Sequence, residues 1–305
     1  MLSVIIPAYN EADIIVKTLD AIFLTLHQHN IPHELIVVDD GSVDHTWEQI
    51  TAFADQNPNV VAICFSRNFG KEAAIFAGLG EATGDAVAVM DGDLQHPAEL
   101  LPEMYTLWQK GFEVVEGVKA NRGKEGICSR LCAHSFYRIW KIFTHIDLSG
   151  GTDFKLMDRK VVQALCSMPE RHTFFRGMNV WVGYRRAQIP FEVPPRAGGK
   201  TKWSWWRLCR FALNAITSFS SAPLQLVTTA GGIFFVFTLV MGLQTLWNKF
   251  SGRAIGGFTT VILLLLMIGS IIMLALGIIG SYLAKIYEEL KGRPRYLITR
   301  RLDRR

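Results

Sequence analysis

The chain has 305 residues, with 32 lysines and arginines against 27 aspartates and glutamates, and half of its residues are apolar. Charged and apolar residues are unevenly distributed along the chain. Residues 211–284 hold no acid and only two bases, Lys249 and Arg253. The basic excess lies on either side of this apolar region, where it suits an anionic membrane surface and a phosphate-bearing ligand. Nucleic acid is therefore not an expected partner.

Two apolar runs in this region, Leu224–Leu246 and Phe258–Leu283, each exceed the roughly 20 residues that a helix needs to cross a bilayer. Residues 196–210 carry five bases and no acid, and residues 285–305 carry eight bases against three acids. Such basic flanks mark the cytoplasmic side of spans joined by a short loop. We therefore expect an integral membrane protein with two transmembrane helices and both termini in the cytoplasm.

Short apolar runs alternate with helical stretches over the first 90 residues, which predicts an α/β fold with a mostly parallel, doubly wound sheet. Each run ends in polar residues, and the carboxyl ends of parallel strands meet at one edge of a sheet. No GxGxxG follows a strand and no phosphate-binding GxxxxGK[ST] occurs, which argues against a dinucleotide oxidoreductase and a P-loop NTPase. One strand is predicted to begin at Leu2, and three more cover residues 34–38, 60–65 and 85–90. Helices are predicted to begin near Ala12 and near Asp44, and a third covers residues 73–81.

The fourth predicted strand ends in Asp91 and Asp93, separated by a glycine and followed by Gln95. Two carboxylates and an amide oxygen form a hard oxygen site, which suits Mg²⁺ or Mn²⁺ carrying a diphosphate. A solvated acidic turn is the alternative interpretation of this pattern alone.

Four segments, VIIPAYNE, VVDDGSVDHT, SRNFGKEAA and DGDLQHP, occur in an order and spacing that resemble the inverting family 2 glycosyltransferases with a GT-A (Rossmann-like) fold. The whole chain more closely resembles their polyprenyl-phosphate group, which includes bactoprenol glucosyltransferases and dolichol-phosphate mannosyltransferases. The resemblance implies a metal held by Asp91, Asp93 and Gln95. It also implies a nucleotide site made of Pro7, Tyr9, Glu11, Asp39 and Asp91.

The resemblance extends to an acceptor side. It makes Asp153, in the segment GGTDFKL, the best candidate for a catalytic residue. The metal-binding Asp93 is the second catalytic candidate. Arg67 and Lys71 lie at a strand end beside the proposed diphosphate, which favours a sugar-nucleotide or structural role, with solvated charges as the alternative. The cations that would meet the acceptor phosphate are Arg122, Arg130, Arg176, Lys200 and Lys202.

The resemblance divides the chain into four parts. Residues 1–195 would form the catalytic domain, 196–222 an acceptor loop with an interfacial amphipathic helix, 223–284 the two-helix anchor, and 285–305 a basic cytoplasmic tail. Trp203, Trp205 and Trp206 begin the amphipathic stretch, for which an ordinary core-facing helix is the alternative.

The implied reaction is inverting transfer of a sugar, with glucose from UDP-glucose favoured, to undecaprenyl or another polyprenyl phosphate. The implied place is the cytoplasmic face of a bacterial inner membrane, where the chain would act as a homo-oligomer, by resemblance a tetramer. Mannose, an amino-arabinose and an N-acetylhexosamine stay open as the sugar. A processive polysaccharide synthase is disfavoured because the chain lacks a QxxRW segment, and a non-catalytic membrane scaffold would be expected to have lost the metal and acceptor motifs.

Overall fold

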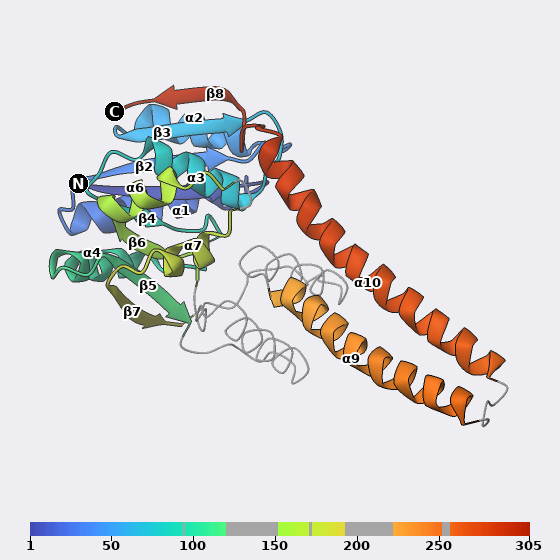
Figure 1. Ribbon diagram of the computed structural model, residues 1–305. Coiled ribbons are helices and arrows are strands. Elements are labelled where there is room, and N and C mark those ends of the chain that lie inside the picture. The colour runs from blue at the N-terminus through green and yellow to red at the C-terminus, as the bar shows by residue number, and fades with distance from the viewer. Residues whose placement is uncertain (94, 120–151, 171–172, 193–221, 252–256) are drawn as a thin grey trace. The chain divides into compact units, whose positions relative to one another are not determined.

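The computed structural model describes residues 1–93, 95–119, 152–170, 173–192, 222–251 and 257–305. The chain divides into two compact units (Figure 1). The first comprises Met1–Lys202 together with Arg293–Arg305, and the second comprises Trp203–Gly292.

The first unit is built on one eight-stranded sheet with the order β7-β5-β6-β4-β1-β2-β3-β8 (Figure 1). Strands β4, β1, β2 and β3 pair in parallel, as predicted, and β7 is parallel to β5. Strand β6 is antiparallel to both β4 and β5, and β8 is antiparallel to β3, so the complete sheet is mixed. The strands are β1 (Leu2–Ala8), β2 (His33–Asp39), β3 (Val60–Phe65), β4 (Ala86–Val89), β5 (Val114–Lys119), β6 (Lys155–Asp158), β7 (Arg186–Phe191) and β8 (Ile298–Asp303).

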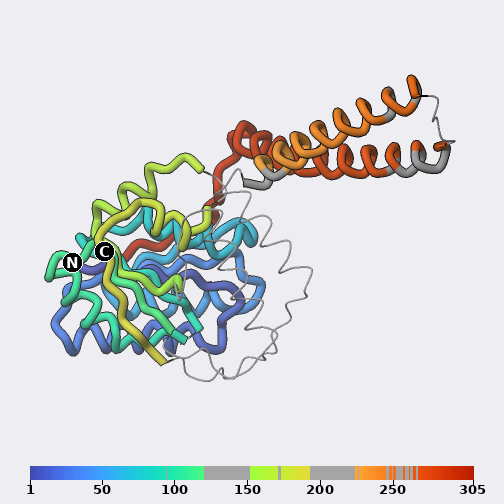
Figure 2. Tube along the Cα trace, turned by 60° about the horizontal axis from the view of Figure 1, so that its bottom comes forward, coloured from blue at the N-terminus to red at the C-terminus, as the bar shows by residue number. Residues whose placement is uncertain are grey.

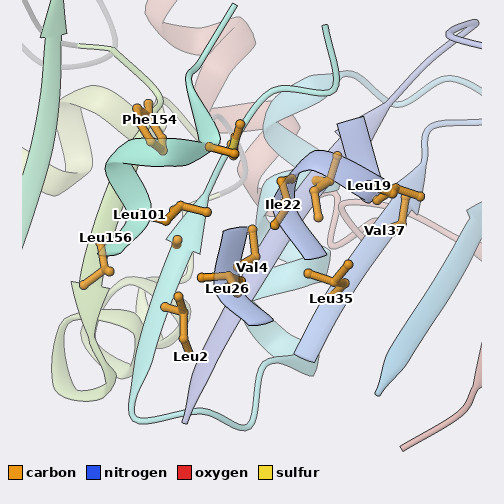
Figure 3. Close-up of a cluster of buried hydrophobic side chains, with 14 of the residues drawn as sticks. Leu2, Val4, Leu19, Ile22, Leu26, Leu35, Val37, Leu101, Phe154 and Leu156 are labelled. Carbon is orange, nitrogen blue, oxygen red and sulfur yellow. The ribbon is translucent and has the colours of Figure 1, made fainter. Parts of the chain in front are cut away.

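Helices cover both faces of this sheet, so every residue of the central strand β1 is buried. On one face Val4 packs in a cluster with Leu19 and Ile22 of α1 (Figure 3). On the other face, Ile5 lies close to Gly78 of α3. A Cβ added at residue 78 would overlap the side chain of Ile5. The helices of the unit are α1 (Ile15–Gln28), α2 (Thr46–Gln56), α3 (Lys71–Glu81), α4 (Leu101–Gln109), α6 (Arg159–Ser167) and α7 (Phe175–Trp181), with a 3₁₀ turn η1 (Ala98–Leu100) before α4.

The end of the chain is part of the first unit, which the sequence analysis did not predict. Strand β8 covers the edge of β3, and Leu302 packs against the hydrophobic core. The guanidinium of Arg295 donates to the carbonyl oxygen of Met168 at 2.6 Å, and the ring of Tyr296 stacks on Phe65 at 4.9 Å between centroids. Within the expected basic tail of residues 285–305, Ile298–Asp303 therefore adds a strand to the sheet, and its pairing with β3 satisfies an edge that would otherwise stay open.

The second unit contains two long helices, α9 (Ala222–Phe250) and α10 (Phe258–Leu290), which contact each other and lie side by side (Figure 2). Each contains a stretch long and apolar enough to cross a membrane, Val227–Gln244 and Met267–Leu290, and neither stretch is buried within the protein. Helix α10 continues past the predicted end of the second span at residue 283. The predicted interfacial amphipathic helix lies outside the described residues.

Candidate active site

The polar residues predicted at the ends of β1, β2 and β4 lie at one edge of the sheet. Because β1, β2 and β4 are parallel, the segments that follow them leave the sheet at the same edge. Strand β6 runs the other way, with Val89 opposite Lys155. The residues two positions beyond this pair, Asp91 after β4 and Asp153 before β6, are therefore brought to the same place.

Asp153 is almost completely buried and is held by two cations. Its carboxylate accepts hydrogen bonds from Nε and Nη2 of Arg176, at 2.7 and 2.9 Å, and from Nζ of Lys71 at 2.7 Å. Burial alone raises the pKa of Asp153, but the hydrogen bonds and charges of Arg176 and Lys71 outweigh it and hold the pKa well below its usual range. Asp153 is consequently ionised at neutral pH and is a poor proton acceptor.

Lys71, the first residue of α3, joins Asp153 to Asp91. Its ammonium lies 2.6 Å from Oδ1 of Asp91 and 2.7 Å from Oδ2 of Asp153. Burial lowers the pKa of Lys71, but the two carboxylates raise it by more, so the side chain stays charged. From the sequence, Lys71 is expected at a strand end beside the proposed diphosphate, with a sugar-nucleotide or structural role. Its contacts with Asp91 and Asp153 are not part of that expectation.

A second carboxyl group, Glu11, lies beside the Asp91–Asp93 segment. Its Oε2 is buried without a hydrogen-bond partner in the described part of the chain, and it lies so close to Gly92 that a Cβ there would overlap it. Burial, followed by the charges of Asp93 and Asp91, raises the pKa of Glu11 to about 7. Negative charge is thus concentrated at this point, which favours a cationic or hydrogen-bond-donating ligand.

Asp91 and Asp93 meet the requirements of a divalent cation that is shared with a substrate. No group of three carboxylate, imidazole or thiol ligands is assembled among the described residues. Two carboxylates with the Gln95 amide leave coordination positions open, and Mg²⁺ and similar ions commonly fill such positions with water and substrate phosphate. The buried Oε2 of Glu11 beside them has no hydrogen-bond partner among the described residues and is a further oxygen that such a ligand can contact. The donor set therefore fits a metal bound together with a diphosphate.

The Asp91 loop is tied to the Asp153 segment by a buried histidine. Nδ1 of His96 accepts a hydrogen bond from the backbone N–H of Asp91 at 3.1 Å, and its ring stacks on Phe154 with 5.0 Å between centroids. Burial lowers the pKa of His96, so the ring stays neutral and keeps its accepting nitrogen. The sequence analysis assigned no role to His96.

The two acids after β2 make contacts within the protein. Asp39 is fully buried, and its Oδ1 accepts from the backbone N–H of Ser42 at 3.0 Å and from the Ser42 hydroxyl. Asp40 accepts from the backbone N–H groups of Phe69 and Gly70 at 2.7 and 2.9 Å. Asp40 thereby anchors the loop that leads into α3.

Glu72 connects α3 to α7. Its Oε2 accepts the backbone N–H of Phe175 at 2.8 Å, at the first turn of α7, where no side chain of α7 itself provides a cap. Burial raises the pKa of Glu72 to about 7. Because Arg176 is the next residue, this contact fixes the cation that binds Asp153.

Comparison with known proteins identifies the family. The model of glycosyl transferase family 2 matches residues 3–165. The chain belongs to glycosyl transferase family 2. It is 38% identical to the uncharacterized glycosyltransferase sll0501 of Synechocystis, over 98% of this chain and 94% of that protein. It is 36% identical to a prophage bactoprenol glucosyl transferase homolog of Escherichia coli, over 98% of each chain, and to the bactoprenol glucosyl transferase of Shigella phage SfX, over 98% and 99%.

A distant likeness extends to solved structures. The mannosyltransferase PcManGT from Pyrobaculum calidifontis matches 83% of each chain, with 20% identity and a TM-score of 0.49.

The site of this family 2 glycosyltransferase contains part of the predicted set. Asp91, Asp93 and Gln95 lie in one loop, with Glu11 against it, and Asp153 and Arg176 are joined to it through Lys71. Pro7 is buried in β1, and the side chain of Tyr9 is exposed at the end of the strand. Four of the predicted acceptor-binding cations lie outside the described residues: Arg122, Arg130, Lys200 and Lys202.

Proposed function

We propose that this enzyme transfers glucose from UDP-glucose to undecaprenyl or a related polyprenyl phosphate, with inversion at the anomeric carbon. The observation that carries the proposal is the similarity to bactoprenol glucosyl transferases over nearly the full length of both chains. The matched region includes the apolar α9 and α10. A lipid-linked acceptor lies in the membrane, so an enzyme that uses it is expected to be anchored there. The product would be a lipid-linked glucose that donates sugar to the cell envelope.

The described residues suit an acceptor that is already ionised. A phosphate monoester has a second pKa of about 6, so at neutral pH it can attack with little help from a general base. Asp153, ionised and held by Arg176 and Lys71, would serve to orient these two cations toward the acceptor rather than to remove a proton. Alignment of acceptor and donor and stabilisation of developing charge would supply most of the rate.

On the donor side, Asp91, Asp93 and Gln95 would hold Mg²⁺ or Mn²⁺. When bound, such an ion neutralises the leaving nucleoside diphosphate as a Lewis acid. Pro7, Tyr9, Glu11 and Asp39 would border the nucleotide, and the unpartnered oxygen of Glu11 can accept a hydrogen bond from it. One displacement at the anomeric carbon converts an α-linked donor into a β-linked lipid product.

The remaining features of the proposal concern the membrane. The basic stretches 196–210 and 285–305 would lie on the cytoplasmic side, with α9 and α10 anchoring the enzyme in the inner membrane. Arg122, Arg130, Lys200 and Lys202 would bind the lipid phosphate together with Arg176. A homo-oligomer, with four copies as the expected number, is part of the same proposal.

Transfer of radiolabel from a panel of nucleotide sugars to undecaprenyl phosphate tests the proposal. The purified chain in detergent is assayed with Mg²⁺, with Mn²⁺ and with EDTA, and labelled lipid is extracted into organic solvent. We expect label from UDP-glucose alone, lost with EDTA and in Asp93→Ala. Label from another donor would correct the sugar, retention of the donor's anomeric configuration would refute inversion, and no labelled lipid from any donor would support a scaffold.

A further inference from the structure

One lysine links the two acidic segments of the site. Asp91 belongs to the proposed metal-binding loop after β4, and Asp153 precedes β6 and carries the cation Arg176. The ammonium of Lys71 contacts both carboxylates, at 2.6 and 2.7 Å. A lysine between two acids of different function is in a position to respond to whatever binds either of them.

The residues that precede and follow Lys71 in the sequence hold its backbone in place. The N–H groups of Phe69 and Gly70 are bound by Asp40, and the side chain of Glu72 is bound by the N–H of Phe175. Gly70 has a φ of +100°, a left-handed conformation that a residue with a side chain adopts only with strain. The backbone at Lys71 is therefore fixed, and the freedom that remains is in its side chain, which is 41% exposed.

Asp153 has a second cation, whereas for Asp91 Lys71 is the one cation found among the described residues. Both oxygens of Asp153 accept hydrogen bonds from Arg176, so this carboxylate stays charge-paired if Lys71 moves. Asp91 Oδ1 has its ion pair with Lys71. An ion that binds Oδ1 of Asp91 must therefore displace the ammonium, and an ion that binds the other oxygen is repelled by it, because the two cations then share one carboxylate.

We propose that Lys71 is a tethered cation that competes with the divalent metal for Asp91 and passes to the acceptor side when the metal and nucleotide bind. Lys71 and Arg176 then both contact Asp153, and these three side chains together carry one positive charge. That excess favours a phosphate monoester. Lys71 is in this sense a positioning residue that makes binding of the anionic acceptor follow binding of the donor. The inference rests on the proposed function and concerns the same site.

Binding of Mn²⁺ in the presence of UDP, without sugar or lipid, tests the competition. Free Mn²⁺ is measured by electron paramagnetic resonance with the full chain in detergent. In Lys71→Met, which keeps an unbranched side chain of nearly the same length and loses its charge, we expect Mn²⁺ to bind about tenfold more tightly. Lys71→Arg keeps the charge and is expected to bind Mn²⁺ no more tightly than the wild type.

Lys160 provides a matched control, because it also lies in the first turn of a helix and pairs with an acid, Glu113, at 2.6 Å. Lys160→Met should leave Mn²⁺ affinity and transfer unchanged. Unchanged or weaker Mn²⁺ binding by folded Lys71→Met, judged by its melting temperature, would overturn the proposal.

A second measurement uses the wild-type protein and so does not depend on a variant that folds. The rate of acylation of each lysine by an amine reagent is followed by mass spectrometry, with and without saturating Mn²⁺. Release from Asp91 should raise the rate at Lys71 at least about twofold and leave Lys160 unchanged, since loss of one of its two carboxylate partners makes the ammonium easier to deprotonate. An unchanged rate at Lys71 would contradict displacement.

These results are separable from the proposed function. Wild-type enzyme that transfers glucose, with no tighter Mn²⁺ binding in Lys71→Met, would refute the inference and leave the function standing. Tighter binding with no transfer to polyprenyl phosphate would refute the function and support the inference.

Discussion

At the scale of single residues, the site is governed by how its acids are paired. Asp153 is paired twice and stays ionised, whereas burial raises the pKa values of Glu11 and Glu72 to about 7. Acids with such different surroundings suit different functions. In the proposed function Asp153 orients cations and Glu11 presents its unpartnered oxygen to a ligand, while Glu72 binds the N–H of Phe175 at the start of α7.

Replacement of Asp153 by asparagine tests its orienting role. The variant would leave Lys71 and Arg176 without the charge that fixes them, so we expect transfer to fall at least about a hundredfold. Labelled lipid formation measures the effect. Asp55→Asn, which alters an exposed ion pair with Arg304, is the control and should retain full activity. Activity of Asp153→Asn within about threefold of the wild type would contradict the assignment.

Glu72 gives a prediction about pH and stability. Folding raises its pKa from the usual 4.5 to about 7, so the folded state holds a proton that the unfolded state releases between these values. Its contribution to stability therefore falls as the pH rises from about 4.5 to about 7. Glu72→Gln keeps an acceptor for the Phe175 N–H, and we expect its Tm to exceed that of the wild type by about 2–4 °C at pH 8 and to converge with it near pH 4.5.

The control for this comparison is Glu48→Gln, because Glu48 occupies the first turn of α2 but is exposed. Melting curves of the three proteins across this pH range provide the measurement. A difference between Glu72→Gln and the wild type that did not change with pH would count against the titration of Glu72.

At the scale of elements, the position of α3 controls the site, because Lys71 and Glu72 form its first turn. The helix lies close to β1 at Gly78, where Ile5 leaves no room for a Cβ. A side chain there would push the helix away from the sheet. The effect would reach the site, since the same helix carries the cation that joins Asp91 and Asp153.

Two glycines of α3 allow a matched test. Gly78→Ala should destabilise the protein by about 1–3 kcal/mol, because the methyl group overlaps a buried isoleucine. Gly80→Ala, where no atom lies within 4 Å of the added carbon, should be neutral or stabilising by up to about 1 kcal/mol. Denaturant or thermal unfolding measures both. Equal effects of the two substitutions would show that the close approach does not limit α3.

At the scale of the whole molecule, the sheet-based unit and the two apolar helices are distinct parts of one chain. The chain enters the apolar part from the sheet-based unit and returns to that unit in β8. In the proposed topology, α9 and α10 each cross the membrane once, so both ends of the helical pair lie on the cytoplasmic side. The proposed topology therefore places the short connection around residues 251–257 on the opposite side.

Reporter fusions test this topology. Alkaline phosphatase, which becomes active after export, should be active when fused after Ser251 and inactive when fused after Arg305. A cytoplasmic reporter should show the reverse pattern. Activity of the exported reporter at the C-terminus would refute the arrangement with both termini in the cytoplasm.

The sequence by itself determined the alternating strands and helices of the first 90 residues and the pair of acids, Asp91 and Asp93, that follows β4. It also determined the two apolar helices, because buried strands, strand ends and helices of membrane length each leave a local pattern of residue types. The order of four motifs predicted the family that the comparisons identify. Each of these properties depends on neighbours in the chain.

The tertiary structure alone decided the pairings between distant residues. Lys71 reaches Asp153 across 82 positions, and this contact follows from the antiparallel register of β6 against β4. Strand β8 carries several charged residues and has no apolar alternation, so its pairing with β3 comes from the open edge it covers and not from its own pattern. Contacts of this kind depend on register and edge, which the local sequence does not specify.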